Sequence, residues 1–167
     1  SIKSINKLKF TEKKKITKDL KNITKKRKNF IEPTLMGILN MTPDSFSDGG
    51  IYNKNEKAFS HIKSMANSGA NIIDIGGEST RPGSKTIEPK KEWKRIANVV
   101  KNFKKKYPKI LLSIDTRKAE IMKKAINHKV DIINDVSCFE HDKDSFKIAS
   151  QAKVWTIIHH MQGTPKN

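Results

Sequence analysis

Residues 71–107 read NIIDIGGESTRPGSKTIEPKKEWKRIANVVKNFKKKY, and this stretch decides the fold class. It opens with a short Ile-rich run, Asn71–Ile75, and turns at a Gly-Gly pair. It then continues into Glu88–Tyr107, where apolar residues recur at helical spacing. Strands buried on both faces of a parallel sheet form such continuous apolar runs, and a three-to-four-residue apolar period is typical of an amphipathic helix. The stretch therefore predicts one strand–turn–helix unit.

The same pattern repeats along the chain after Pro33. Strands are predicted at Leu35–Asn40, Asn71–Ile75, Ile110–Asp115, Val130–Val136 and Val154–His160. Helices are predicted at Glu56–Ser68, Glu88–Tyr107, Arg117–His128 and Asp142–Ala152, with Gly69 as a helix C-cap. The alternation indicates a parallel α/β fold and leaves two architectures open, a doubly wound sheet and a closed barrel. Both bind ligands beyond the carboxyl ends of their strands.

Charge is concentrated at the start of the chain. The 167 residues carry a formal charge of +18, and residues 1–31 hold twelve Lys/Arg against two acidic residues, a net +10. Such a segment attracts polyanions, but no aromatic residues interleave with the lysines to stack on bases, so nucleic acid is not the favoured partner. We interpret residues 1–33 as a basic lead-in of unknown role, in which Ile16, Leu20 and Ile23 fall at helical spacing, and residues 34–167 as the domain.

Cysteine content and hydropathy suggest a compartment. Cys138 is the only cysteine, which excludes an internal disulfide and favours a reducing, cytoplasmic setting. We expect it to act as a small buried hydrophobe. No apolar run reaches the roughly 18 residues that a membrane span needs, and no apolar signal segment follows the basic start. A membrane partner is therefore not expected.

The first two predicted strands end in residues of functional type. Residues 40–50 read NMTPDSFSDGG. The oxygens of Asn40 and the acidic residues suit Mg²⁺, and Phe46 offers a flat apolar face to an aromatic ligand. Residues 76–83 read GGESTRPG, where Thr80 and Arg81 suit a phosphate or carboxylate. A turn built from Asx and Ser/Thr motifs remains the alternative for the first segment, and a plain Gly-rich turn for the second.

The next strand ends carry Asp115, Asn134 and the pair His159-His160. A carboxylate and a carboxamide at adjacent strand ends can bind a heterocycle with alternating donors and acceptors. A helix N-cap remains the alternative for Asp115, and a turn residue for Asn134. Adjacent histidines on a strand point to opposite sides, so a zinc site is not favoured.

These segments together resemble a known family. Residues 36–50 (MGILNMTPDSFSDGG) and 72–83 (IIDIGGESTRPG) are similar to the two signatures of dihydropteroate synthases. Residues 113–116, 132–135 and 160–165 match further family segments in the same order. The resemblance covers about residues 34–167 and implies a TIM (β/α)8 barrel, of which about the first five βα units are present.

The resemblance also implies a reaction of folate biosynthesis. The amine of p-aminobenzoate attacks the methylene of 6-hydroxymethyl-7,8-dihydropterin diphosphate, giving 7,8-dihydropteroate, and Mg²⁺-bound diphosphate leaves. Carried over by position, Asp115 and Asn134 would hold the pterin, and Asn40 would touch the metal and diphosphate. Thr80 would reach the diphosphate or p-aminobenzoate. The remaining roles fall to Phe46, Arg81 and Pro82, which would close the p-aminobenzoate site, and to Asp48, which would steady a developing cation.

The resemblance breaks off after the fifth strand, where the family's later functional residues cannot be placed. We therefore expect the 167-residue chain alone to be inactive and poorly stable, and its parent enzyme to be a homodimer. Three alternatives remain open. They are a methyltetrahydrofolate-binding barrel of a corrinoid methyltransferase, a non-catalytic pterin-binding fragment, and a nucleic-acid binder acting through residues 1–31.

Overall fold

The computed structural model describes residues 33–42, 51–79 and 84–159, with the side chains of residues 51–53 excepted. The chain divides into two units between Thr34 and Leu35. The predicted amphipathic helix around Leu20 lies outside the described residues, so the fold below is that of the second unit alone.

Strands and helices alternate through the described residues. The strands are β1 (Met36–Asn40), β2 (Ile72–Gly76), β3 (Leu111–Asp115), β4 (Ile132–Asp135) and β5 (Trp155–Ile158). The helices are α3 (Ile51–Asn67), α4 (Pro89–Lys106), α5 (Ala119–Asn127) and α6 (Ser145–Gln151). Every predicted strand and helix is confirmed. Most ends agree within one to three residues, whereas α3 begins five residues earlier than predicted.

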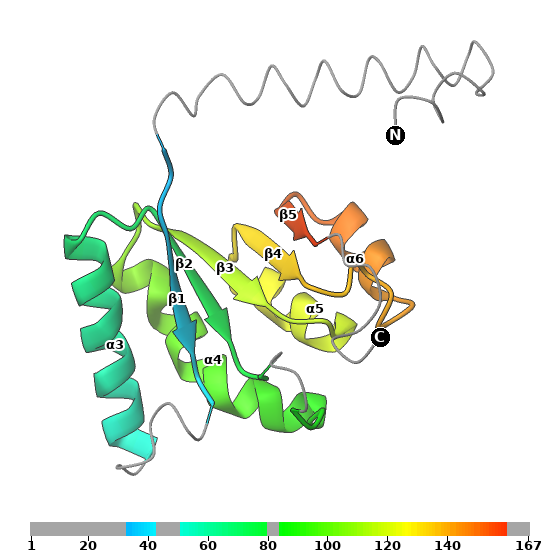
Figure 1. Ribbon diagram of the computed structural model, residues 1–167, viewed down its shortest axis with the longest axis horizontal. Helices are drawn as coiled ribbons and strands as arrows, with labels where there is room; N and C mark the ends of the chain where they lie inside the picture. The colour runs from blue at the N-terminus through cyan, green and yellow to red at the C-terminus, as the bar shows by residue number, and fades with distance from the viewer. Residues whose placement is uncertain (1–32, 43–50, 80–83, 160–167) are drawn as a thin grey trace. The chain divides into compact units, whose positions relative to one another are not determined.

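The strand order decides between the two architectures that the sequence left open. The five strands pair in parallel in the order β1-β2-β3-β4-β5, and α3–α6 all lie on one side of the sheet (Figure 1). Right-handed crossovers between successive neighbouring strands place every helix on the same face. A doubly wound sheet would reverse its strand order and carry helices on both faces. The described residues therefore form consecutive units of a barrel-type fold.

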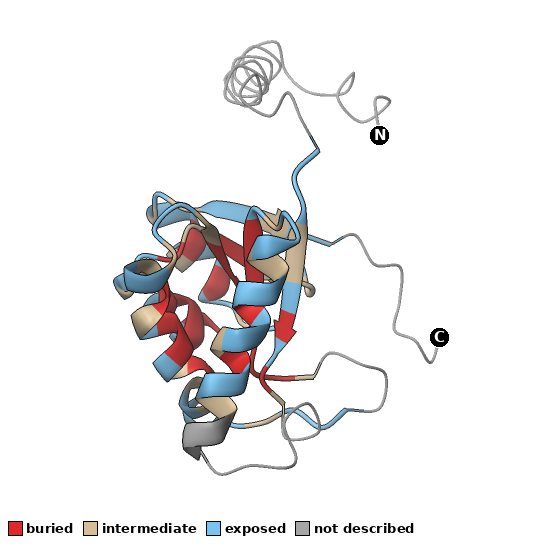
Figure 2. Ribbon diagram, turned by 90° about the vertical axis from the view of Figure 1, so that its left-hand side faces the viewer, coloured by how far each residue is buried: buried red, intermediate tan, exposed pale blue. Residues whose placement is uncertain are grey.

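The two faces of the sheet differ in burial. The helix-facing side chains form the core, which Figure 2 shows as a buried layer between sheet and helices. On the opposite face Ile38 is 60% exposed and Trp155 is 48% exposed. The prediction of strands buried on both faces is therefore wrong for the edge strands β1 and β5. It holds for the interior strand β2, whose residues are all buried.

Two helices end in the same hydrogen-bonded turn. After α3, Gly69 N–H donates to the Ala66 carbonyl and Ala70 N–H to the Met65 carbonyl. After α5, Lys129 N–H donates to the Ile126 carbonyl and Val130 N–H to the Ala125 carbonyl, the same Schellman pattern. Gly69 has φ +96° and Lys129 has φ 63°. The predicted C-cap role of Gly69 is confirmed, and a lysine occupies the equivalent position after α5.

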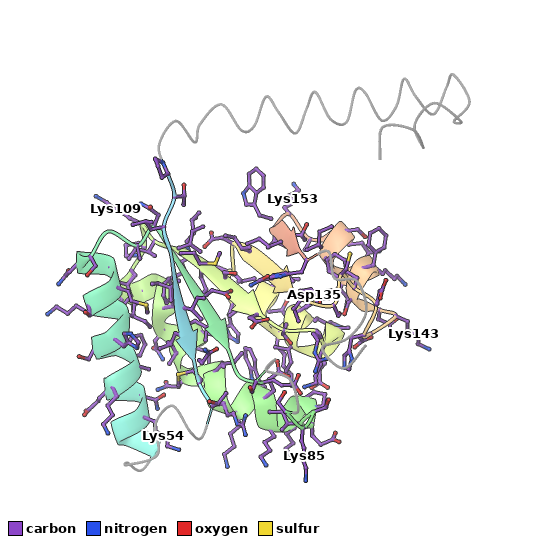
Figure 3. The ribbon with its side chains drawn as sticks, in the orientation of Figure 1. Lys54, Lys85, Lys109, Asp135, Lys143 and Lys153 are labelled. Atoms are coloured by element: carbon purple, nitrogen blue, oxygen red, sulfur yellow. The ribbon has the colours of Figure 1, made fainter. Side chains whose placement is uncertain are left out.

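The turn after β4 corrects the prediction for Cys138, which is exposed rather than buried. Asp135, labelled in Figure 3, is fully buried and accepts hydrogen bonds from Ser137 N–H, Ser137 Oγ and Phe139 N–H. This turn holds Cys138 and Phe139 at positive φ. The sequence alone did not indicate that the thiol leaves the core here. No helix among the described residues is long and apolar enough to cross a membrane.

Candidate functional site

Three predicted site residues lie in a single row across the sheet. Asn40 pairs with Gly76, Gly76 with Asp115, and Asp115 with Asn134, so these four positions are registered neighbours on β1 to β4. Residues in register on parallel strands point to the same face. The row belongs to the face of the sheet opposite α3–α6, at the carboxyl ends of the strands (Figure 1). With strands about 4.8 Å apart, it is about 14 Å long.

Gly76 forms a gap in the middle of this row. A Cβ placed there would lie 3.4 Å from Asp115 Oδ2 and 3.5 Å from Asn40 Oδ1, which are ordinary contact distances. A side chain would therefore fit sterically, but it would fill the space between the two oxygens. Asn40 itself is exposed. The missing side chain leaves room for a ligand to lie against the backbone between Asn40 and Asp115.

Asp115 sits in a strongly acidic environment. Burial, followed by the charges of Asp74, Glu92 and Asp135, raises the pKa of Asp115 from 3.8 to about 7, and Arg117 offsets this only in part. Asp115 is not a helix N-cap, because Lys118 occupies that position before α5. A carboxyl group of this kind can accept a hydrogen bond as an anion or donate one as an acid near neutral pH.

The carboxamide of Asn134 is held by two side chains. Its Nδ2 donates to Asp74 Oδ2 at 3.0 Å, and its Oδ1 lies 3.0 Å from His159 Nε2. Because one amide hydrogen and one oxygen lone pair remain free of these two bonds, Asn134 can still pair with a ligand edge. Asn134 lies in β4 rather than in a turn. His159 is thus linked to the row by its contact with the Asn134 side chain.

Asp74 is a site residue that the sequence analysis missed. It lies in the middle of β2, is 4% exposed, and has no hydrogen-bond partner for Oδ1. Burial raises the pKa of Asp74, against the opposing effects of Ser113, Asn134 and His159. The sequence held one signal for this role. Side chains two residues apart on a strand point to the same face, so Asp74 must share the face of Gly76. We interpret Asp74 as the support of Asn134.

The other predicted site residues lie outside the described residues, and their roles stay predictions. They are Phe46, Asp48, Thr80, Arg81 and Pro82. Within the described ranges, no group of three or more His, Cys, Asp or Glu residues could hold a metal ion. Asn40 contributes one exposed amide oxygen at the end of the row. This fits Mg²⁺, which usually keeps several waters and takes few protein ligands beside phosphate oxygens.

Known proteins match this chain over nearly all of the described residues. The family model described as "Pterin binding enzyme" matches residues 36–167. This chain belongs to the pterin-binding enzyme family. Among curated relatives, the dihydropteroate synthase of Clostridium beijerinckii is 44% identical over 126 residues, 75% of this chain and 46% of that protein. The chain thus spans about half the length of the pterin-binding enzymes that it matches.

Solved pterin-binding enzymes share the architecture. A Clostridium difficile dihydropteroate synthase, crystallised in the presence of pteroic acid, is 41% identical with a TM-score of 0.75, and the match covers 80% of this chain and 51% of that one. The Xanthomonas albilineans enzyme with 4-aminobenzoic acid is 37% identical with a TM-score of 0.73, and the match covers 80% and 48%. The described strands and helices thus correspond to about half of these TIM barrels, which confirms the predicted fold family.

Proposed function

We propose that these residues form one half of the active site of a dihydropteroate synthase, which condenses 6-hydroxymethyl-7,8-dihydropterin diphosphate with p-aminobenzoate. The row of Asn40, Gly76, Asp115 and Asn134 carries the proposal. It places a carboxyl and a carboxamide side by side at one end and a lone amide at the other. The names of the relatives support the reaction. They do not favour the methyltransferase-type or non-catalytic alternatives.

The acidic end of the row suits the pterin ring. Asp115, Asp74 and Asn134 present mainly acceptor atoms, and a pterin edge carries ring N–H and amino donors. Because the pKa of Asp115 is about 7, the neutral and the ionised carboxyl are both populated near neutral pH. A ligand that donates hydrogen bonds to this carboxyl would favour its ionised form. The same acidity repels phosphate. The diphosphate would therefore lie away from Asp115, towards Asn40.

The neutral end of the row suits the leaving group. Asn40 would hold a Mg²⁺ ion together with the diphosphate, and the bound ion would neutralise charge on the departing oxygens. Thr80 would reach the diphosphate or p-aminobenzoate, and Phe46, Arg81 and Pro82 would enclose p-aminobenzoate. Asp48 would steady positive charge that develops on the methylene. Chemistry of this kind depends on positioning and charge stabilisation more than on a protein nucleophile.

The remaining expectations belong to the same proposal. The parent enzyme would be a homodimer in the cytoplasm, binding small molecules rather than nucleic acid. The 167-residue chain alone would show no turnover, because it spans about half the length of the matched synthases.

The test is diphosphate release by the native protein purified from its source, with pterin diphosphate and p-aminobenzoate added singly and together. Release that requires both substrates supports the synthase. Pterin binding without release would contradict it and would favour a non-catalytic binder. Gly76→Ala should weaken pterin-diphosphate binding without unfolding the protein, because its Cβ meets only ordinary contacts. Glu120→Gln, which removes a surface ion pair with Lys124, is the control.

A further inference from the structure

A buried ion cluster lies beside the row, between the strand ends and α4. It consists of Glu78, Glu92 and Lys118, whose side chains are at most 6% exposed. Lys118 Nζ lies 2.6 Å from Glu92 Oε2 and 3.1 Å from Glu78 Oε2. Thr116 Oγ donates to Glu92 Oε1 at 2.6 Å. Charges removed from water this completely persist only when they are paired and hydrogen-bonded.

Glu78 joins the two ends of the segment that follows β2. Its Oε1 accepts the backbone N–H of Ile87 at 2.9 Å, nine residues further along. Its Oε2 accepts from Arg117 Nη2 at 3.2 Å and also faces Lys118. Between these ends, Ser84 Oγ donates to the Ser79 carbonyl at 2.5 Å. One carboxylate therefore fixes where this segment leaves β2 and where it enters α4.

The packing at Gly77 brings this segment close to α4. Arg95 Nη1 donates to the Gly77 carbonyl at 2.7 Å. A Cβ at Gly77 would lie 2.9 Å from the backbone oxygen of Glu92, closer than side chains approach without a backbone shift. The absence of a side chain at Gly77 allows this approach. The segment after β2 is thus anchored to α4 on one side and to the start of α5 on the other.

The electrostatics keep Glu78 ionised. Burial alone would raise the pKa of Glu78, but the Ile87 N–H, Lys118 and Arg117 together outweigh it and lower the pKa below its usual 4.5. At neutral pH the carboxylate is therefore fully available as an acceptor for both ends of the segment.

We propose that Glu78 is a positioning residue, which holds together the two ends of the segment whose sequence includes Thr80 and Arg81. Lys118 pairs with Glu78 and with Glu92. The inference rests on the proposed function only for the roles of Thr80 and Arg81. Anchoring itself is a property of the described contacts and can be measured without turnover.

The first experiment compares Glu78→Gln and Glu78→Ala with Lys118→Met and wild type. It measures hydrogen exchange at the Ile87 amide and trypsin cleavage after Lys85, a residue exposed at the α4 end of the segment (Figure 3). We expect Glu78→Ala to raise both rates about tenfold or more through local opening, with a smaller rise for Glu78→Gln. Lys118→Met leaves the Glu78–Ile87 bond in place. It should lower the urea midpoint while sparing the Ile87 amide.

Two results would overturn the proposal. One is unchanged Ile87 exchange in both Glu78 variants. The other is exchange in all three variants that simply follows the loss of global stability, which would make the cluster a stabilising element only. Because Glu78→Gln keeps the shape of the side chain, it preserves the test if Glu78→Ala does not fold.

A second readout uses the native protein. Glu78→Gln should raise the KM for p-aminobenzoate about tenfold and the KM for pterin diphosphate by less, since Arg81 would help to enclose p-aminobenzoate whereas Asp115 and Asn134 would hold the pterin. Glu120→Gln, which removes a surface ion pair with Lys124, should leave both KM values unchanged. Equal rises in both KM values for Glu78→Gln would contradict positioning. Absence of turnover in wild type would defeat the proposed function, whereas the exchange measurement would still decide the role of Glu78.

Discussion

At the residue scale, the carboxyl groups at the site also destabilise the folded protein. Asp115 and Asp74 are both held where burial raises their pKa, and they share one acidic region with Glu92 and Asp135. Carboxylates gathered in this way repel one another and lose hydration, so folding works against their ionised forms. A bound ligand with N–H donors would relieve the repulsion. The arrangement is typical of a site in which stability is given up for binding.

Replacing Asp115 with Asn should stabilise the protein in a pH-dependent way. Because the folded-state pKa is raised to about 7, the folded form binds a proton that the unfolded form releases between about pH 4 and pH 7. The penalty of ionised Asp115 therefore grows across this window and is complete above it. We expect Asp115→Asn to raise the free energy of unfolding by about 1 to 3 kcal/mol at pH 8, with no gain near pH 3.

Urea denaturation of both proteins at a series of pH values measures this difference. The same substitution should weaken pterin binding, since an amide cannot supply the carboxylate acceptor. A stability difference that stays constant from pH 3 to pH 8 would show that Asp115 does not titrate as described.

The row of site residues could be predicted only in part. The sequence places Asn40, Asp115 and Asn134 at strand ends, and the resemblance attaches roles to them. Their alignment with Gly76 depends on strand register, which short apolar runs do not specify. Asp74 was missed because an acidic residue inside an Ile-rich run reads as part of the strand. Its carboxylate accepts a hydrogen bond from Asn134, sixty residues away, and this partner cannot be read from the strand itself.

At the element scale, strand–helix alternation was predictable because each helix carries its own apolar face. The ends of α3 and α5 depend instead on a single backbone conformation. Gly69 adopts positive φ without cost, whereas Lys129 adopts it with a side chain that opposes it. The two turns otherwise make the same pair of hydrogen bonds. Lys129 is therefore a strained position at the surface.

Lys129→Gly should stabilise the protein by about 0.5 to 1 kcal/mol, because glycine removes the left-handed strain. Lys123→Gly, in the exposed interior of α5, should cost about 1 kcal/mol. Thermal or urea unfolding of the two variants provides the comparison. If both variants lose stability equally, Lys129 does not occupy the conformation seen here.

At the scale of the whole molecule, the strand order determines which face of the sheet the helices cover. Sequential parallel strands put all four described helices on one face, so the other face keeps Ile38 and Trp155 in contact with solvent. The sequence could not predict this, because Ile38 and Leu39 look alike in an apolar run. Leu39 is 1% exposed and Ile38 is 60% exposed. The difference follows from which face the helices cover.

Adjacent alanine substitutions test this description. Leu39→Ala should cost about 2 to 5 kcal/mol, because it leaves a cavity against the helices. Ile38→Ala should cost less than about 1 kcal/mol, as exposed positions do. Urea unfolding at two protein concentrations gives both values. Equal costs would show that the helix-free face is also buried, and a dependence on concentration would show that association buries it.

The turn after β4 offers a practical handle on the site. Cys138 is exposed and is the chain's only cysteine, and it lies four residues after Asn134, whose amide would hold the pterin. The turn that carries it is fixed by the buried Asp135. A thiol-reactive fluorophore would therefore attach at one known point, beside the strand end, without any engineered residue. Ligand binding to the chain could then be followed by a change in emission.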